Sequence, residues 1–275
     1  MIKALNIPQF SIENFPDGTF RINTPELDSL AENEPIKLVW KYENDAELFV
    51  LTCITDNLHE RTSNPIELCM PYLPNARMDR VHHETEAFTL KSFCRMINRL
   101  NFSKVSVLDV HSSVGIALLD RAVNLSPKPY IEKAIEIAGI DKTSDCVFFP
   151  DEGSCKRYSG LLDGFRHIGF GIKKRNWDDG KILGLDVIGD ITEGSKVLII
   201  DDICSYGGTA YYSALKLKEL GCREVSAYFT HCENSIAQGK LFEGDLISRI
   251  ITTDSLCTLD TQQYQKLNIL SFDAE

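Results

Sequence analysis

The spacing of apolar residues along the chain predicts alternating helices and strands from about residue 89 onward. Between residues 89 and 100 the apolar positions recur every three or four residues, which is typical of one helical face. The same spacing follows Ser126-Pro127 and ends at Gly139, and a third helix is predicted over 209–220. Short apolar runs typical of buried strands separate these helices, at residues 104–110, 146–149, 196–200 and 224–229.

This alternation predicts the α/β class, with two doubly wound parallel-sheet domains. The stretch from 196 to 229 is one βαβ unit. A boundary near residue 126 gives each side its own strand–helix series, so we expect domains at 1–126 and 127–261. The tail, 262–275, is expected to pack back on the first domain. Residues 25–68 are less regular, and strands are predicted there only at 36–40 and 48–53.

The composition disfavours binding to nucleic acids and to anionic membranes. The chain has 29 basic and 40 acidic residues, which gives a formal net charge of −11. Proteins that bind nucleic acids or anionic membranes usually have a basic surface instead. The sequence contains neither a membrane-length apolar run nor a secretion signal at its start. Its nine cysteines are scattered without a C-x-x-C pair, which argues against a disulfide framework and a zinc ribbon. We therefore expect a cytoplasmic protein that binds neither nucleic acid nor membrane.

The most specific segment is VLIIDDICSYGGTA at residues 197–210. An apolar strand ends in Asp201 and Asp202, at the sheet edge where open α/β folds bind ligands. Gly207 and Gly208 allow a tight turn, and Thr209 begins a helix whose free N–H groups suit a phosphate. Carboxylates accept hydrogen bonds from sugar hydroxyls, so the segment predicts a sugar-phosphate site.

This segment resembles the ribose-phosphate loop of type I phosphoribosyltransferase folds. Five further segments narrow the resemblance to the ribose-phosphate pyrophosphokinases, also called phosphoribosyl pyrophosphate synthetases. PYLPNARMDR at 71–80 resembles the family's P-Y-x-P-Y-A-R-Q-D-R segment, and LDVHS at 108–112 resembles its D-L-H metal motif. FPDEG at 149–153 resembles the S-P-D-x-G pyrophosphate loop, and IKKR at 172–175 matches the K-x-R pair of the catalytic flexible loop. FPDG at 15–18 resembles the family's F-S-D-G-E segment.

The resemblance implies two α/β domains of phosphoribosyltransferase type and a Mg²⁺-dependent reaction. Pyrophosphate passes from ATP to the anomeric 1-hydroxyl of ribose 5-phosphate, giving phosphoribosyl pyrophosphate and AMP. Because this reaction gathers many negative charges, catalysis is mostly positioning and charge neutralisation. Family members share the ATP site between subunits, so a homo-oligomer with its ATP site at the subunit interface is also implied.

The resemblance assigns roles to individual residues. Those expected to bind ATP are Asp17, Arg77, Asp79 and His111. Those expected to hold the metal are His111 and Asp151. Those expected to catalyse are His111 together with Lys173 and Arg175, which lie in a polar stretch that resembles a mobile lid. Those expected to contact the acceptor are Asp201, Asp202, Ser205, Tyr206, Gly207, Gly208 and Thr209.

Three departures from the family pattern bear on these roles. The chain begins shortly before Phe15, so we expect most of the family's first strand and helix to be absent. Thr19 and Met78 replace a glutamate and a glutamine that contribute to ATP recognition. In the acceptor loop, Ser205 and Tyr206 stand where the family has aspartate and threonine. The tyrosine would crowd a pocket shaped for a terminal phosphate, but it can stack against a larger group attached to that phosphate.

Ribose 5-phosphate is the first expected acceptor, because the resemblance is broad. The alternative is ADP-ribose, which would give ADP-ribose 1-pyrophosphate in NAD-related metabolism, since it has a free anomeric hydroxyl and an adenine to stack. A simple phosphoribosyltransferase is a further alternative. The segments around Arg77 and around Asp109 and His111 argue against it, because a simple transferase needs no ATP-binding domain. A regulatory relative without catalysis would usually lose the lid cations or the paired carboxylates, which this chain keeps.

Overall fold

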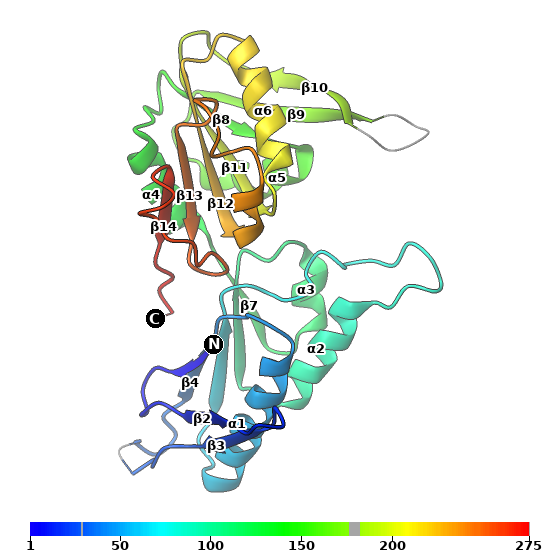
Figure 1. Ribbon diagram of the computed structural model, residues 1–275, viewed down its shortest axis with the longest axis vertical. Coiled ribbons are helices and arrows are strands. Elements are labelled where there is room, and N and C mark those ends of the chain that lie inside the picture. The colour runs from blue at the N-terminus through cyan, green and yellow to red at the C-terminus, as the bar shows by residue number, and fades with distance from the viewer. Residues whose placement is uncertain (29, 176–181, 275) are drawn as a thin grey trace. The chain divides into compact units, whose positions relative to one another are not determined.

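The computed structural model describes residues 1–28, 30–175 and 182–274, with the backbone alone for 173–175 and 182–184. It divides into two compact units, each with its own sheet (Figure 1). The first unit is Met1–Ser126 with the last residues of the chain, and the second is Pro127–Phe272. The tail 262–275 was expected to pack on the first unit, but residues 262–272 belong to the second. The reason is that β14 (Leu267–Leu270) pairs with β13 (Arg249–Thr253).

The first unit has a five-stranded sheet whose order is β1-β4-β5-β6-β7. Its strands are β1 (Ile2–Ala4), β4 (Ile36–Trp40), β5 (Ile66–Met70), β6 (Lys104–Leu108) and β7 (Ala122–Leu125). All pair in parallel except the edge strand β1. The connecting helices are α1 (Ala46–Arg61), α2 (Thr89–Arg99) and α3 (Ser113–Leu118). A separate hairpin consists of β2 (Ser11–Asn14) and β3 (Phe20–Asn23).

The strand expected at 48–53 is wrong, because those residues lie in α1. Leu48, Leu51, Ile54 and Leu58 are buried at helical spacing against the sheet, and this period exceeds the short window that suggested a strand. The strand at 36–40 is confirmed as β4, and the helix at 89–100 is confirmed as α2 within one residue.

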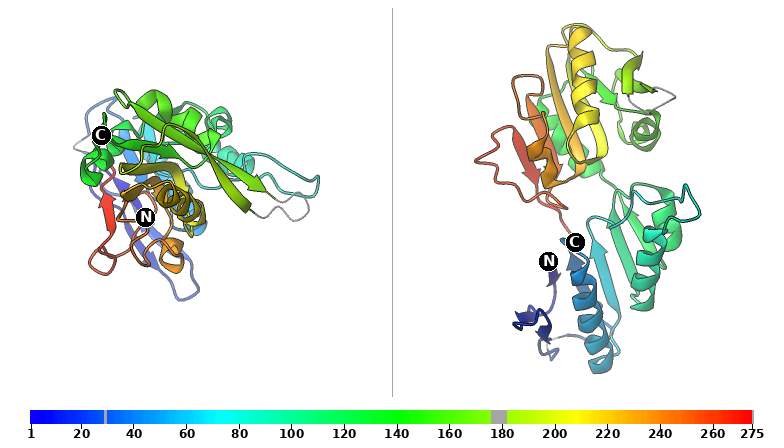
Figure 2. Two further views of the ribbon diagram at one scale, coloured as in Figure 1. Left: turned by 90° about the horizontal axis from the view of Figure 1, so that it is seen from above. Right: turned by 45° about the vertical axis from the view of Figure 1, so that its right-hand side comes forward.

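The second unit has a seven-stranded sheet whose order is β10-β9-β8-β11-β12-β13-β14. Its remaining strands are β8 (Cys146–Phe149), β9 (His167–Arg175), β10 (Ile182–Gly189), β11 (Lys196–Cys204) and β12 (Glu224–Cys232). Its helices are α4 (Lys128–Ala138), α5 (Glu152–Tyr158) and α6 (Gly208–Glu219), with short 3-10 turns η1 (Ser159–Leu161) and η2 (Asn234–Gln238). The helix α6 lies along one face of this sheet, as the right-hand view of Figure 2 shows.

The α/β class with parallel sheets is confirmed in both units. The reversal of strand order that defines a doubly wound sheet occurs in the second, where β8–α5–β9 runs one way and β11–α6–β12 the other. In the first unit, the described parallel strands β4 to β7 lie in the sheet in the same order as they occur in the chain. The reversal creates a switch point between the carboxyl ends of β8 and β11, which is where ligands bind in open α/β sheets.

Candidate active site

The predicted acceptor residues and Asp151 come together at this switch point. Asp151 follows β8 after one residue and caps α5, where its Oδ1 accepts a hydrogen bond from the backbone N–H of Ser154 at 3.0 Å. Asp201 and Asp202 lie near the carboxyl end of β11, the neighbouring parallel strand. Two segments about fifty residues apart in the sequence thus place three carboxylates at one sheet edge.

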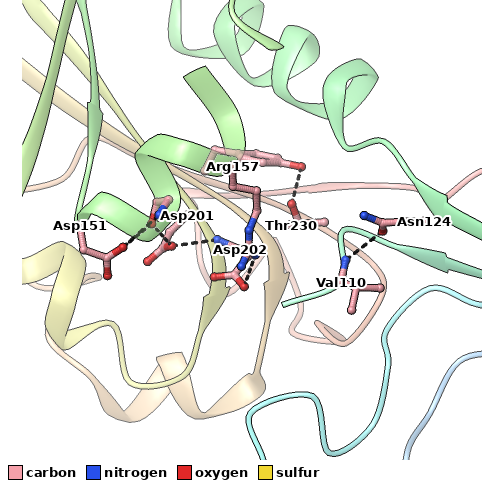
Figure 3. Close-up of polar contacts among 9 residues, drawn as sticks. Val110, Asn124, Asp151, Arg157, Asp201, Asp202 and Thr230 are labelled. Atoms are coloured by element: carbon pink, nitrogen blue, oxygen red, sulfur yellow. Dashed lines mark hydrogen bonds and ion pairs between the residues drawn. The ribbon is translucent and has the colours of Figure 1, made fainter. Parts of the chain in front are cut away.

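Two side chains of α5 contact the paired carboxylates (Figure 3). The hydroxyl of Ser154 donates to Asp201 Oδ1 at 2.7 Å and lies 3.1 Å from Asp151 Oδ1. Arg157 Nη1 donates to Asp202 Oδ2 at 2.5 Å. The sequence alone did not reveal either residue, because the partners are 47 and 45 residues apart in the chain and leave no local pattern.

The site concentrates acidic charge. Burial raises the pKa of Asp201 to about 7, with further increases from the neighbouring carboxyls of Asp202 and Asp151, while the hydrogen bond from Ser154 opposes the shift. Near neutral pH the protonated and ionised forms of the Asp201 carboxyl are therefore both populated. Perturbed carboxyls at a sheet switch point are typical of ligand-binding sites.

The acceptor loop, Ser205 to Thr209, has its backbone fixed by close packing. Gly207 has φ +78°, and a Cβ there would come within 2.4 Å of the Leu241 side chain. A Cβ on Gly239 would likewise meet the backbone oxygen of Tyr206 at 1.9 Å. With its backbone held against residues 239–241, Tyr206 has an outward side chain that is 60% exposed. It therefore offers an open aromatic face.

A carboxylate stands beside the loop at a place that the sequence did not reveal. Ser205 Oγ donates to Glu233 Oε2 at 2.7 Å, and Ser235 Oγ donates to the same oxygen at 3.2 Å. A carboxylate therefore lies next to the neutral serine that stands in place of the family's aspartate. Glu233 follows directly after β12, which pairs with β11, so only the pairing of the two strands reveals its place.

In the first unit, two predicted ATP-binding segments follow neighbouring parallel strands. Arg77 and Asp79 come after β5, and His111 comes after β6. Because both strands point the same way, the segments emerge from the same sheet edge. Arg77 is exposed, and Asp79 and His111 are partly exposed. The His111 turn is anchored by the backbone N–H of Val110, which donates to Asn124 Oδ1 at 3.1 Å (Figure 3).

The remaining predicted residue of this unit, Asp17, lies at the exposed tip of the β2–β3 hairpin. Its Oδ1 accepts hydrogen bonds from the Thr19 backbone N–H at 3.0 Å and from the Thr19 hydroxyl at 2.7 Å. These bonds lower the pKa of Asp17. Thr19, which replaces the family's glutamate, therefore fixes the orientation of this carboxylate.

The two predicted lid cations, Lys173 and Arg175, have side chains outside the described residues. Their backbone forms the end of β9, paired with β10 in antiparallel register, for example Lys173 with Leu185. The polar stretch expected to be a loop from residue 173 therefore begins as a strand, because it continues the pairing of an antiparallel ribbon.

The described residues hold no group of three or more histidine, cysteine or acidic side chains arranged for a metal ion. His111 and Asp151, the two expected metal ligands, belong to different units. Magnesium needs no larger protein cage, because it is usually bound through one or two carboxylates together with substrate phosphates and water. The carboxyl of Asp151 lies close enough to Asp201 to raise the pKa of Asp201. Acidic charge suited to a divalent cation is therefore present around Asp151 and Asp201.

Comparison with known proteins finds curated proteins similar to this chain along most of its length. No family model matches the chain. Ribose-phosphate pyrophosphokinase 2 of Enterococcus faecalis is 28% identical over 269 residues, which cover 98% of this chain and 83% of that protein. Ribose-phosphate pyrophosphokinase of Sulfurisphaera tokodaii is 26% identical over 262 residues, covering 92% and 87%. The chain is a relative of the ribose-phosphate pyrophosphokinases.

The fold agrees with this relationship. The crystal structure of phosphoribosylpyrophosphate synthetase from Mycobacterium smegmatis matches 95% of this chain and 85% of its own, with a TM-score of 0.76 at 20% identity. The likeness covers both units, as the motifs shared with the pyrophosphokinases do.

Among the described residues, none of the helices is long and apolar enough to cross a membrane.

Proposed function

We propose that the chain catalyses Mg²⁺-dependent transfer of pyrophosphate from ATP to the anomeric 1-hydroxyl of a ribose 5-phosphate acceptor. With ribose 5-phosphate itself the products would be phosphoribosyl pyrophosphate and AMP. The observation that carries the proposal is the switch point, where Asp151 and the paired carboxylates of β11 adjoin a glycine turn that starts α6. This arrangement suits an acceptor with hydroxyls at one end and a phosphate at the other.

On the acceptor side, Asp201 and Asp202 would accept hydrogen bonds from the ribose hydroxyls. The N–H groups of Gly207, Gly208 and Thr209 at the start of α6 would hold the 5-phosphate, because a helix N-terminus attracts anions. Asp151 would contact the pyrophosphate or its metal ion.

On the ATP side, Asp17, Arg77, Asp79 and His111 would bind the nucleotide. Arg77 suits its phosphates because the guanidinium is a planar donor fork. Lys173 and Arg175 would approach the transferred group when the lid closes. Mg²⁺ held by His111 or by Asp151, in each case together with substrate phosphates, would neutralise charge on the transferred group.

The exposed hairpin tip supports a further proposal, that the active form is a homo-oligomer. Phe15 is 49% exposed beside Asp17, and a large apolar side chain at an exposed tip is suited to contact another subunit. The Asp17 turn of one chain would then complete the ATP site of its neighbour.

ADP-ribose is a second candidate acceptor, and the exposed ring of Tyr206 favours it. Stacking of a base on an aromatic side chain contributes about 1–3 kcal/mol. The Glu233 carboxylate, held beside Ser205, acts in the same direction. It would repel the dianion of a terminal phosphate more than the single charge on a phosphate within a diphosphate.

Incubation of the purified protein with ATP, Mg²⁺ and each acceptor, followed by mass spectrometry, tests the proposal. Conversion of either acceptor to a product heavier by one diphosphate group supports it, and absence of transfer to both contradicts it. The double variant Ser205→Asp with Tyr206→Thr separates the candidates, because it should lose ADP-ribose activity preferentially if Tyr206 stacks on the base. The matched control is Tyr212→Thr, which alters a different exposed tyrosine that lies on α6.

A further inference from the structure

The helix α5 directs two polar side chains at the sugar site. Ser154 and Arg157 are three residues apart, so they lie on the same face of the helix. Each contacts a different member of the acidic pair, Ser154 bonding to Asp201 and Arg157 to Asp202 (Figure 3). We refer to Ser154 and Arg157 as the α5 pair.

Ser154 is a buried connection between the N-cap of α5 and strand β11. Its residue is only 5% exposed, and its hydroxyl lies within 3.1 Å of one oxygen on Asp151 and 2.7 Å from one on Asp201. The same Asp201 oxygen accepts the backbone N–H of Asp202 at 3.0 Å. A buried carboxylate with several fixed donors has little freedom to rotate. The serine therefore links the orientation of Asp201 to that of the Asp151 loop.

Arg157 provides the cation for the second carboxylate. The Asp202 side chain is 9% exposed and that of Arg157 is 26% exposed. Two adjacent acidic side chains repel each other, and an unpaired buried charge is costly. The guanidinium therefore stabilises Asp202 as a carboxylate in one orientation, leaving the Asp202 side chain fixed rather than splayed away from Asp201.

We propose that the α5 pair are positioning residues that hold the Asp201 and Asp202 carboxylates in the orientation that accepts the ribose hydroxyls. This inference rests on the proposed function, because it assigns the paired carboxylates to the acceptor. Neither residue of the pair transfers a proton or a phosphate. Each acts through the carboxylate that it holds, and small misplacement of such groups is sufficient to weaken substrate positioning.

The test compares Arg157→Met, Arg157→Lys and Ser154→Ala with Lys156→Met. Lys156 lies next to Arg157 on α5, its side chain is 76% exposed, and it pairs with Glu152 one turn away on the same helix. Lys156→Met therefore removes the same charge from a neighbouring position. We expect Arg157→Met to raise KM for the acceptor by about tenfold or more and KM for ATP by less than about twofold. Arg157→Lys should recover much of the loss, because it restores a cation beside Asp202. Ser154→Ala should raise KM for the acceptor by about fivefold or more, whereas Lys156→Met should leave both constants unchanged.

The results separate this inference from the proposed function. If the parent transfers pyrophosphate and the Arg157 and Ser154 variants change both KM values equally, or change only thermal stability, the positioning role is overturned. If Arg157→Met does not fold, Arg157→Lys and Ser154→Ala decide by the same comparison. If the parent transfers pyrophosphate to neither acceptor, the proposed function fails. Calorimetric binding of ribose 5-phosphate and ADP-ribose then decides. Weaker binding by the α5 variants than by Lys156→Met supports the role, and equal binding, or no binding by the parent, overturns it.

Discussion

Replacing Asp201 by asparagine is expected to stabilise the fold while it removes activity. The pKa of this carboxyl is raised from 3.8 to about 7 by burial and by the neighbouring carboxyls. Between these two pH values the folded protein binds more protons at this site than the unfolded chain does. The contribution of Asp201 to stability is therefore favourable at low pH and is lost as the pH rises through the window.

The magnitude follows from the two pKa values. Each pKa difference of one corresponds to about 1.4 kcal/mol, so ionisation of Asp201 costs the folded state at most about 4 kcal/mol at pH 8. Asparagine has the same shape and keeps a carbonyl oxygen for the Ser154 hydroxyl and the Asp202 N–H, but it carries no charge. Relative to the parent, Asp201→Asn should gain about 2 kcal/mol in unfolding free energy between about pH 5.5 and pH 8.

Urea unfolding of the parent and the variant at these two pH values, with a chelator and without nucleotide, measures the difference. Asp141→Asn is a control of opposite sign. Hydrogen bonds from Thr143 and Ser144 lower the pKa of Asp141 to about 2, so its neutralisation should reduce stability at pH 8. The reasoning is refuted if Asp201→Asn is less stable than the parent at pH 8, or if its advantage does not grow with pH.

Three further predictions concern the lid, the assembly and the acceptor loop. Lys173→Ala or Arg175→Ala should lower turnover by about 10²-fold or more with little change in ATP binding, as steady-state kinetics and calorimetry would show. Turnover within a few-fold of the parent would contradict the lid assignment. Light scattering should find a dimer or larger oligomer, and an active monomer would contradict an ATP site completed by Asp17 of a neighbour. Gly207→Ala should weaken acceptor binding, as calorimetry would measure, because Gly207 has φ +78° and the new methyl group would meet Leu241. Unchanged binding would show that this turn does not hold the phosphate.

The sequence predicted well the features that depend on neighbouring residues. The helix from Lys128 to Ala138 buries the apolar positions that its spacing indicates, and Gly139 ends it with φ +60°. The acidic pair at the end of β11 was equally visible, because an apolar strand leads directly into it. Its strand continues to Cys204, four residues past the predicted end, because the backbone goes on pairing with β12 up to Cys232.

The sequence failed where position depends on pairing between distant segments. Ser154 meets Asp201 across 47 residues, and Ser205 meets Glu233 across 28. Neither contact leaves a local pattern. The β2–β3 hairpin and the edge strand β14 were also not predicted, because such short strands have few residues in which alternation could be seen.

The central claim is the transfer of an intact diphosphate to a sugar phosphate, and ³¹P NMR of the reaction mixture tests it most directly. Purified protein with ATP, Mg²⁺ and ribose 5-phosphate, or with ADP-ribose in a parallel sample, is followed until ATP is consumed. The account predicts that AMP and a 1-diphosphate of one acceptor rise together at equal rates, with signals of two coupled phosphorus atoms on the sugar. Formation of ADP together with an acceptor that carries a single phosphate at its 1-hydroxyl would contradict it. Release of free pyrophosphate without a sugar product, or stable ATP with both acceptors, would contradict it as well.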